Sequence, residues 1–395
     1  MSYTLIKGGN AVFENEIKKT DILIKDGIIA DVAFCGEIPE NCEVIDADSA
    51  YVSPGFVDIH VHGGAGYDFM DCTVNAFRGI SDVHLKNGTT TMLPTAVSAE
   101  FGSMLNFIEE YKRAVPLCPN FCGIHLEGPY ISKEQKGAHK EHLLHSPTDA
   151  ETEKLLGVGK GIIRRITAAP ELDNMEAFTK RMVENGVLMS VGHSNATSAE
   201  TQNAFEHGFS HITHLYSATS SIHKVNQKVE AGVIEAAYLN DDVSIELIGD
   251  GKHVAVDAMK LAMKIKGSDK IALVSDALRP AGTDVKESYL GEKIEANRVI
   301  IEDGVAKLPD RSCFAGSIAT GIMLLERGIN HYGLSVCETV KMLTRTPADI
   351  LGMKNIGRLE EGCTANIVVF DKNCKIKTVL LNGAAVTDKK KGKLA

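Results

Sequence analysis

Eight short runs of apolar and β-branched residues, separated by amphipathic stretches, recur along the middle of this 395-residue chain. The intervening stretches, such as DNMEAFTKRMVENG and VDAMKLAMKIKG, have the spacing of helices with one apolar face. Eight βα units across about 300 residues favour a closed (β/α)8 barrel, an α/β fold, over a doubly wound sheet. The expected strands cover residues 56–60, 89–94, 122–127, 162–168, 187–191, 211–214, 243–248 and 271–275.

A doubly wound sheet would also be expected to carry a phosphate-binding turn, G-x-G-x-x-G, after its first strand. The segment at that place, GGAGYDF at 63–69, is rich in glycine but does not match this pattern. The sequence therefore predicts the barrel, with residues 53–353 as its extent.

The two ends of the chain are predicted to be short strands joined by turns. Asp26-Gly27 and Asn382-Gly383 are hairpin signals between apolar runs. We expect residues 1–52 and 354–395 to build one small β-sandwich domain together, with the barrel inserted between them.

Charge and cysteine content exclude several classes of protein. The net charge of −10 provides no general attraction for nucleic acid, so an anionic ligand needs a local site. Nine scattered cysteines, without CxxC spacing, favour buried thiols in a reducing cytosol over a disulfide scaffold. The chain shows neither a signal peptide nor an apolar run of about 18 residues, so we expect a cytoplasmic enzyme with no membrane partner.

Histidines and acids gather at the carboxyl ends of five expected strands, the place where chemistry sits in such barrels. Any one of them would more often be an ordinary hydrogen-bonded residue, but six at one structural position indicate a metal centre. Imidazoles with carboxylates and open positions suit Zn²⁺ or Fe²⁺ in a catalytic site. The six candidates are His60, His62, Glu127, His193, His214 and Asp276.

A metal centre of this kind predicts a TIM-like metal-dependent hydrolase. The ion lowers the pKa of bound water and polarises a carbonyl oxygen, which suits hydrolysis of an amide. Asp276 is the best candidate for the general base that passes a proton to the leaving amine. A barrel without activity, serving as an assembly protein, is the alternative from another class, but such proteins typically lose ligands or the base.

Seven motifs resemble the N-acetylglucosamine-6-phosphate deacetylase family of the amidohydrolase superfamily: PGFVDIHVHG, HLEGPY, KGAH, VGHSNAT, HLYSAT, GDGKHV and VSDA. The resemblance implies that Glu127, His193 and His214 bind a metal and that Asp276 is the catalytic acid and base. His60 and His62 are retained, so one or two ions are expected. The family also implies a homodimer.

The same resemblance implies contacts to an amino sugar substrate. Ala138 and His139 of KGAH lie where the family places the acetamide, and His253 matches another substrate contact. Ser217, Ala218 and Ser317 fall at family positions whose backbone contacts the substrate.

Two departures concern the 6-phosphate of the family's substrate. Ser217 and Thr219 stand where the family has Asn and Met, and the phosphate-binding Arg motif is missing from residues 222–232. Lysine cannot copy the bidentate fork of arginine. Lys224, Lys228 and Arg279 are the replacement cations we consider. The alternative substrate is a related N-acyl amino sugar, either the galacto epimer or an unphosphorylated compound.

Overall fold

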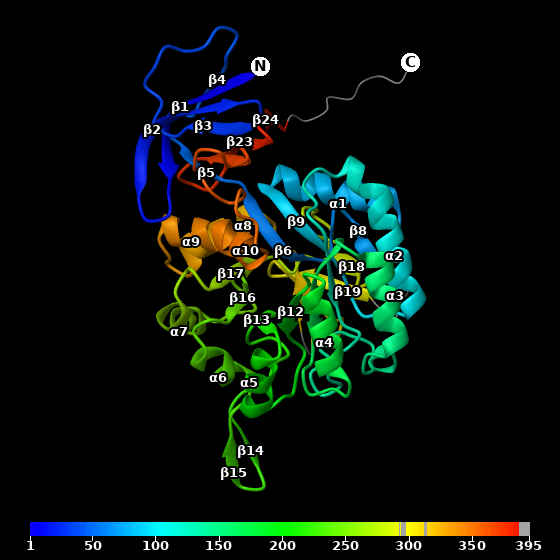
Figure 1. The fold of residues 1–395 in the computed structure, drawn as a ribbon. Coiled ribbons are helices and arrows are strands. Elements are labelled where there is room, and N and C mark those ends of the chain that lie inside the picture. The colour runs from blue at the N-terminus through cyan, green and yellow to red at the C-terminus, as the bar shows by residue number, and fades with distance from the viewer. Residues whose placement is uncertain (292, 294–297, 312–313, 387–395) are drawn as a thin grey trace.

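The predicted (β/α)8 barrel is confirmed by a computed structural model that describes residues 1–291, 293, 298–311 and 314–386. Eight parallel strands form one sheet in the order β17-β16-β13-β12-β11-β10-β9-β6 (Figure 1). Their bounds are β6 Phe56–Val61, β9 Thr89–Ala96, β10 Ile124–Glu127, β11 Ile163–Ala168, β12 Leu188–Val191, β13 Phe209–Ile212, β16 Ser244–Ile248 and β17 Ile271–Val274. The sixth strand was expected at 211–214, so His214 follows this strand instead of ending it.

The first and last strands, β6 and β17, approach each other at their carboxyl ends. The backbone N–H of Asp276 donates to the carbonyl oxygen of His60 at 3.0 Å, and Val61 forms a bridge with Ala277. The N–H of Ser275 lies 3.3 and 3.4 Å from the two carboxylate oxygens of Asp58. These contacts nearly close the barrel and bring the loop after β17 beside the end of β6.

Helices cover the outside of the barrel. Several begin with the Ser/Thr-x-x-Glu capping box, including α3, α5 and α9, in which the first side chain accepts from the backbone of the fourth residue. The bounds are α1 Val74–Lys86, α2 Phe101–Ala114, α3 Asp149–Gly159, α4 Met175–Glu184, α5 Ser198–Glu206, α6 Val233–Leu239, α7 Val256–Lys266, α8 Gly321–Glu326, α9 Val336–Leu343 and α10 Arg345–Ile350. Short 3-10 turns η1 Phe69–Asp71, η2 Val115–Leu117 and η3 Glu141–Leu143, and a π turn η5 Arg327–His331, join them.

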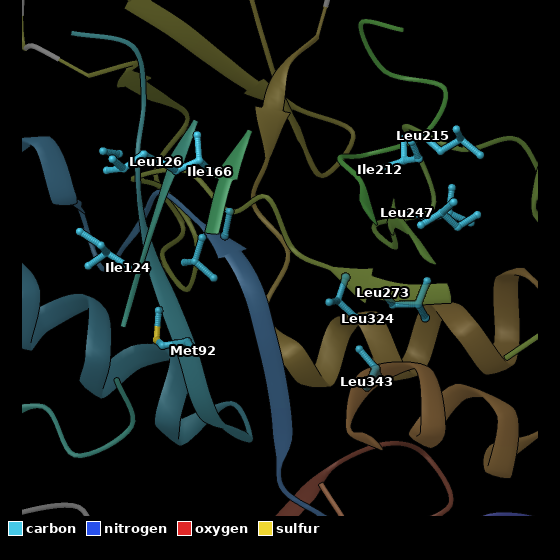
Figure 2. Packing of buried hydrophobic residues seen from close by; sticks show 14 of the residues in the cluster. Met92, Ile124, Leu126, Ile166, Ile212, Leu215, Leu247, Leu273, Leu324 and Leu343 are labelled. Carbon is cyan, nitrogen blue, oxygen red and sulfur yellow. The ribbon is translucent and has the colours of Figure 1, made fainter. Parts of the chain in front are cut away.

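The main apolar core lies between the strands and these helices. Figure 2 shows Leu273 of β17 near the helical residues Leu324 and Leu343, and Leu126 of β10 beside Ile166 of β11. Burial of this apolar surface holds the barrel together. None of the helices in the described part of the chain combines the length and apolar character that a bilayer-spanning segment requires.

The two chain ends build one β structure together, as predicted, and its strands form a single mixed sheet. Its order is β24-β23-β22-β5-β1-β2-β3, with β4 paired to β1, and β22 pairs antiparallel to β5. Asp26 and Gly27 have φ of 50° and 81°, and Asn382 and Gly383 have 50° and 76°, as both predicted hairpin turns require. The bounds are β1 Tyr3–Val12, β2 Ile17–Lys25, β3 Ile28–Asp31, β4 Glu43–Asp46, β5 Tyr51–Pro54, β22 Ile367–Phe370, β23 Ile376–Leu381 and β24 Ala384–Ala385.

The division at 52/53 and 353/354 stays a proposal for the domain boundaries. Residues 387–395 of the expected small domain, and Cys313 among the cysteines, lie outside the described residues. Glu14, which follows β1, forms ion pairs with Lys341 of α9 and Arg345 of α10, so the terminal sheet is bound to the barrel helices.

Three smaller sheets extend the barrel loops. A four-stranded antiparallel sheet follows β17, with β18 Glu287–Tyr289, β19 Arg298–Glu302, β20 Val305–Lys307 and β21 Phe314–Ser317. We call this sheet, together with Leu290 and Gly291 that follow β18, the flap. The hairpin of β14 His223–Val225 and β15 Lys228–Glu230 projects away from the barrel (Figure 1). Strands β7 Gly63–Gly64 and β8 Tyr67–Asp68 form a short hairpin after β6.

Candidate metal centre and substrate cavity

The predicted strand-end residues aim their side chains at one point. Glu127 is the last residue of β10, whereas His193, His214 and Asp276 each lie two residues beyond β12, β13 and β17. These three residues have left-handed backbones, with φ of 48°, 27° and 47°. Such a conformation costs about 1–3 kcal/mol in a residue with a side chain and concentrates at functional sites. The strain turns each side chain out of its loop toward the barrel axis.

Glu127, His193 and His214 form the first half of the cluster. Oε1 of Glu127 lies 3.2 Å from Nε2 of His193 and 3.0 Å from Nε2 of His214, and the two Nε2 atoms are 3.1 Å apart. Each Nδ1 is hydrogen-bonded to a backbone carbonyl oxygen, that of Gln135 at 2.8 Å for His193 and that of Ser217 at 3.0 Å for His214.

The hydrogen bonding of the His193 and His214 rings indicates that the first half of the cluster is suited to a cation. A carbonyl oxygen only accepts, so both Nδ1 atoms carry a proton, and in its neutral form each ring presents an Nε2 lone pair to the cluster. In that form two lone pairs and a carboxylate oxygen face one another without a donor, the arrangement of a set of metal ligands. A cation between these atoms would replace their mutual repulsion by attraction. Ligand atoms around tetrahedral Zn²⁺ are separated by about 3.3 Å, which is close to the distances between these nitrogen and oxygen atoms. The residues therefore fit a metal ion.

His60 and His62 form the second half of the cluster, also with Glu127. Their Nε2 atoms are 3.1 Å apart, and that of His62 lies 3.1 Å from Oε2 of Glu127 and 3.2 Å from Oδ1 of Asp276. Nε2 of His60 lies 3.3 Å from Oε1 of Glu127. Nδ1 of His60 is 2.7 Å from Oε1 of Glu246, so this ring, in its neutral form, also directs an Nε2 lone pair at the cluster. Glu127 is therefore shared by both halves of the cluster.

The electrostatics of the cluster keep its carboxylates ionised. Burial opposes charge on Glu127, but His60 and hydrogen bonds from the surrounding histidines hold its pKa well below the ordinary value. Burial likewise opposes charge on Asp276, yet His60 and His62 keep its pKa lowered. Burial disfavours a charged His62, but Asp276 and Glu127 raise its pKa to about 9. Without a cation, protons on the imidazoles balance these acids, so metal and protons compete for one site.

A cavity of about 240 Å³ opens above the cluster. Its walls include apolar side chains from the barrel loops and from the flap, among them Val97, Leu278, Leu290 and Phe314. Ten of the predicted site residues line it: His62, Glu127, Ala138, His139, His193, His214, Ser217, Ala218, His253 and Asp276.

Two histidines of the wall have fixed surroundings. Nδ1 of His139 lies 2.7 Å from Oγ of Ser98, and burial lowers the pKa of His139 to about 4, so its ring is neutral. Nδ1 of His253 lies 2.7 Å from a carboxylate oxygen of Asp250. Burial works against charge on His253, but Asp250 outweighs it and raises the pKa.

The other predicted residues do not line the cavity. His60 lies beneath it and is fully buried. Ser317 is buried in β21, where its Oγ accepts from the N–H of Ala319 at 2.9 Å, while its neighbour Gly316 reaches the cavity. Lys224 and Lys228 lie on the β14–β15 hairpin, which points away from the barrel (Figure 1).

Arg279 corrects our expectation of a free cation beside Asp276. Its guanidinium binds both carboxylate oxygens of Asp71, at 2.6 and 2.8 Å, and donates to the carbonyl oxygen of Gly291 at 2.6 Å. The Arg279 side chain is buried, and its guanidinium is already hydrogen-bonded to Asp71 and Gly291. Arg279 therefore fixes the flap and does not face the cavity. Among the described residues that line the cavity, none is Lys or Arg.

Sequence reasoning missed two kinds of contributor to the site. Asp68 of β8 lines the cavity and is almost fully buried, and the flap supplies Leu290, Gly291 and Phe314. The spacing of Asp68 after the His-x-His motif was an available signal. The local sequence around the flap residues does not predict that they line the cavity. They reach its mouth only because the antiparallel strands of the flap fold back toward the barrel.

Comparisons with known proteins place this chain in a family. Residues 51–386 match the family model described as Amidohydrolase family. The N-acetylglucosamine-6-phosphate deacetylase of Bacillus subtilis (strain 168) is 31% identical, over 96% of this chain and 96% of its own. An N-acetylgalactosamine-6-phosphate deacetylase of Shewanella sp. (strain ANA-3) is also 31% identical, over 83% of this chain and 81% of its own.

Solved structures are similar over the whole fold. The N-acetylglucosamine-6-phosphate deacetylase of Pasteurella multocida superimposes with a TM-score of 0.90 at 27% identity, covering 98% of this chain and 100% of its own. A mutant of the Mycobacterium smegmatis enzyme in complex with N-acetyl-D-glucosamine-6-phosphate gives 0.89 at 28% identity, covering 98% and 99%.

Proposed function

Because this chain belongs to the amidohydrolase family, and within it to the N-acetylhexosamine-6-phosphate deacetylases, we propose that it hydrolyses the acetamide of N-acetylglucosamine 6-phosphate. The products are acetate and glucosamine 6-phosphate. The observation that carries the proposal is the convergence of the Glu127 carboxylate and the Nε2 atoms of His193 and His214 beside Asp276, at the floor of a cavity.

Glu127, His193 and His214 hold the metal ion in this proposal, with His60 and His62 as ligands of a second. The ion, Zn²⁺ or Fe²⁺, supplies Lewis acidity and lowers the pKa of bound water. Asp276 takes up a proton as general base and delivers it to the nitrogen of the leaving amine. Its lowered pKa keeps it in the base form at neutral pH.

The wall residues orient the substrate. His139 is neutral, and with Nδ1 directed to Ser98 its Nε2 lies on the cavity side, 3.6 Å from Glu127, where it contacts the acetamide group. His253 contacts the sugar, held by Asp250. The backbones of Ala138, Ser217 and Ala218 complete this contact surface.

A specific observation favours a second candidate substrate. No Lys or Arg lines the described part of the cavity, and the guanidinium of Arg279 is engaged by Asp71. A phosphate dianion would then have to rely on neutral donors or on a cation from elsewhere. The second candidate is therefore a related N-acyl amino sugar, either the galacto epimer or an unphosphorylated compound.

One experiment separates these candidates. The metal-reconstituted enzyme is assayed for acetate release with N-acetylglucosamine and N-acetylgalactosamine, each with and without the 6-phosphate. We expect the highest kcat/KM for N-acetylglucosamine 6-phosphate. A higher kcat/KM for an unphosphorylated or galacto compound would replace the first candidate by the second, and acetate release from none of the four would contradict both.

The homodimer implied by the family resemblance is also part of the proposal. Light scattering behind size-exclusion chromatography measures it directly. A mass near 42.6 kDa, that of one chain, would contradict it.

A further inference from the structure

A buried ion pair lies inside the barrel, beneath the histidine cluster. Arg165 of β11 donates from NH1 to Oε2 of Glu246 of β16 at 2.6 Å, and both side chains are fully buried. Arg165 is fixed by further hydrogen bonds to Oγ of Ser190 at 2.9 Å, Oγ1 of Thr213 at 2.9 Å and the carbonyl oxygen of Ile59 at 3.1 Å. The guanidinium is thus held from four directions.

The second carboxylate oxygen of Glu246 connects the ion pair to both halves of the cluster. Oε1 accepts from Nδ1 of His60 at 2.7 Å and from the backbone N–H of His214 at 3.0 Å. The first contact sets the tautomer and the plane of the His60 ring. The second holds the loop at the point where His214 adopts its left-handed backbone.

A buried ion pair is weak evidence of a role in stability. Desolvating two charges costs about as much as their attraction returns, and apolar replacements of a buried pair are often neutral or stabilising. The Arg165 charge cancels that of Glu246, so the pair adds no net charge to the cluster above it. Its remaining distinctive property is the oriented acceptor that it offers to His60 and His214.

We infer that Glu246, held in place by Arg165, is a positioning residue that fixes His60 and His214 for metal binding. The inference rests on the metal site of the proposed function. Partners that orient a ligating histidine through its other nitrogen typically change metal affinity 10- to 100-fold when removed.

The test replaces the ion pair without leaving a buried charge. In Arg165→Met/Glu246→Leu both charges and the acceptor are gone, whereas in Arg165→Met/Glu246→Gln an amide oxygen still accepts from His60. Ser190→Ala is the matched control, since it removes a partner of Arg165 but touches neither histidine. Zn²⁺ content and dissociation constant are measured by chelator competition, and the Co²⁺ absorption spectrum reports the ligand geometry.

We expect Zn²⁺ to bind about 10- to 100-fold more weakly to the Met/Leu variant, with a changed Co²⁺ spectrum. The Met/Gln variant should recover most of the affinity, and Ser190→Ala should stay within about threefold of the original chain. Circular dichroism and thermal unfolding establish that each variant is folded.

Unchanged Zn²⁺ affinity in the folded Met/Leu variant would overturn the inference. If that variant does not fold, Arg165→Met/Glu246→Ala decides, because it also removes both charges and the acceptor: a loss of Zn²⁺ affinity of about tenfold or more relative to the Met/Gln variant supports the inference, and an affinity equal to that of the Met/Gln variant overturns it. Absence of Zn²⁺ binding by the original chain would instead contradict the proposed metal site itself.

Discussion

Asp276 has both properties that a general base at this site requires. Its Oδ1 lies 3.2 Å from Nε2 of His62, and its side chain opens into the cavity. Its pKa is lowered, so the base form persists at neutral pH. We predict that Asp276→Asn retains its metal but loses about 10²- to 10⁴-fold in kcat, the usual contribution of a general base. Elemental analysis and acetate release measure the two effects, and near-original turnover would remove Asp276 from this role.

His193 and His253 form a matched pair of cavity histidines for testing the ligand set. Nε2 of His193 belongs to the cluster, whereas His253 is bound to Asp250. We predict that His193→Ala lowers metal content because a ligand is lost. His253→Ala should keep the metal stoichiometry and raise KM. Elemental analysis after gel filtration gives the comparison, and equal metal content in both variants would show that the ligand set is misassigned.

At the scale of elements, Arg279 joins three segments around the mouth of the cavity. Its fork binds Asp71 of η1, and one nitrogen also donates to Gly291 of the flap, which lines the cavity. Lysine cannot make the bidentate contact. We predict that Arg279→Lys raises KM more than it lowers kcat, because the flap wall shifts while the cluster is untouched. Steady-state kinetics measure this, and a loss confined to kcat would contradict it.

The elements also show what could be predicted and what could not. All eight barrel strands were expected, because apolar runs and amphipathic spacing are local properties. The sixth strand was placed two residues late, since the polar residues 213–214 were included in it. The partner of Arg279 was missed because Asp71 is 208 residues away in the sequence. No local pattern distinguishes a free arginine from one already engaged.

At the scale of the whole molecule, the cluster connects loops from five strands of the barrel. A cation bound there stabilises the folded chain by about 4 kcal/mol when present at 1,000 times its dissociation constant. We predict that chelation lowers the midpoint of thermal unfolding by on the order of 5 °C. Differential scanning calorimetry measures the shift. The same treatment should leave His193→Ala nearly unchanged, and an equal shift in both proteins would contradict a site-specific cause.

The sequence by itself determined which residues would meet at the mouth of the barrel. Strand positions follow from hydrophobic periodicity, and the carboxyl ends of parallel barrel strands lie at one face, so Glu127, His193, His214 and Asp276 had to come together. Only the tertiary structure decided how the other charges are used. Glu246 is bound to Arg165, 81 residues away, and Arg279 to Asp71. A charge in a sequence has no partner until folding brings one within hydrogen-bond distance, and such distances depend on the whole packed chain.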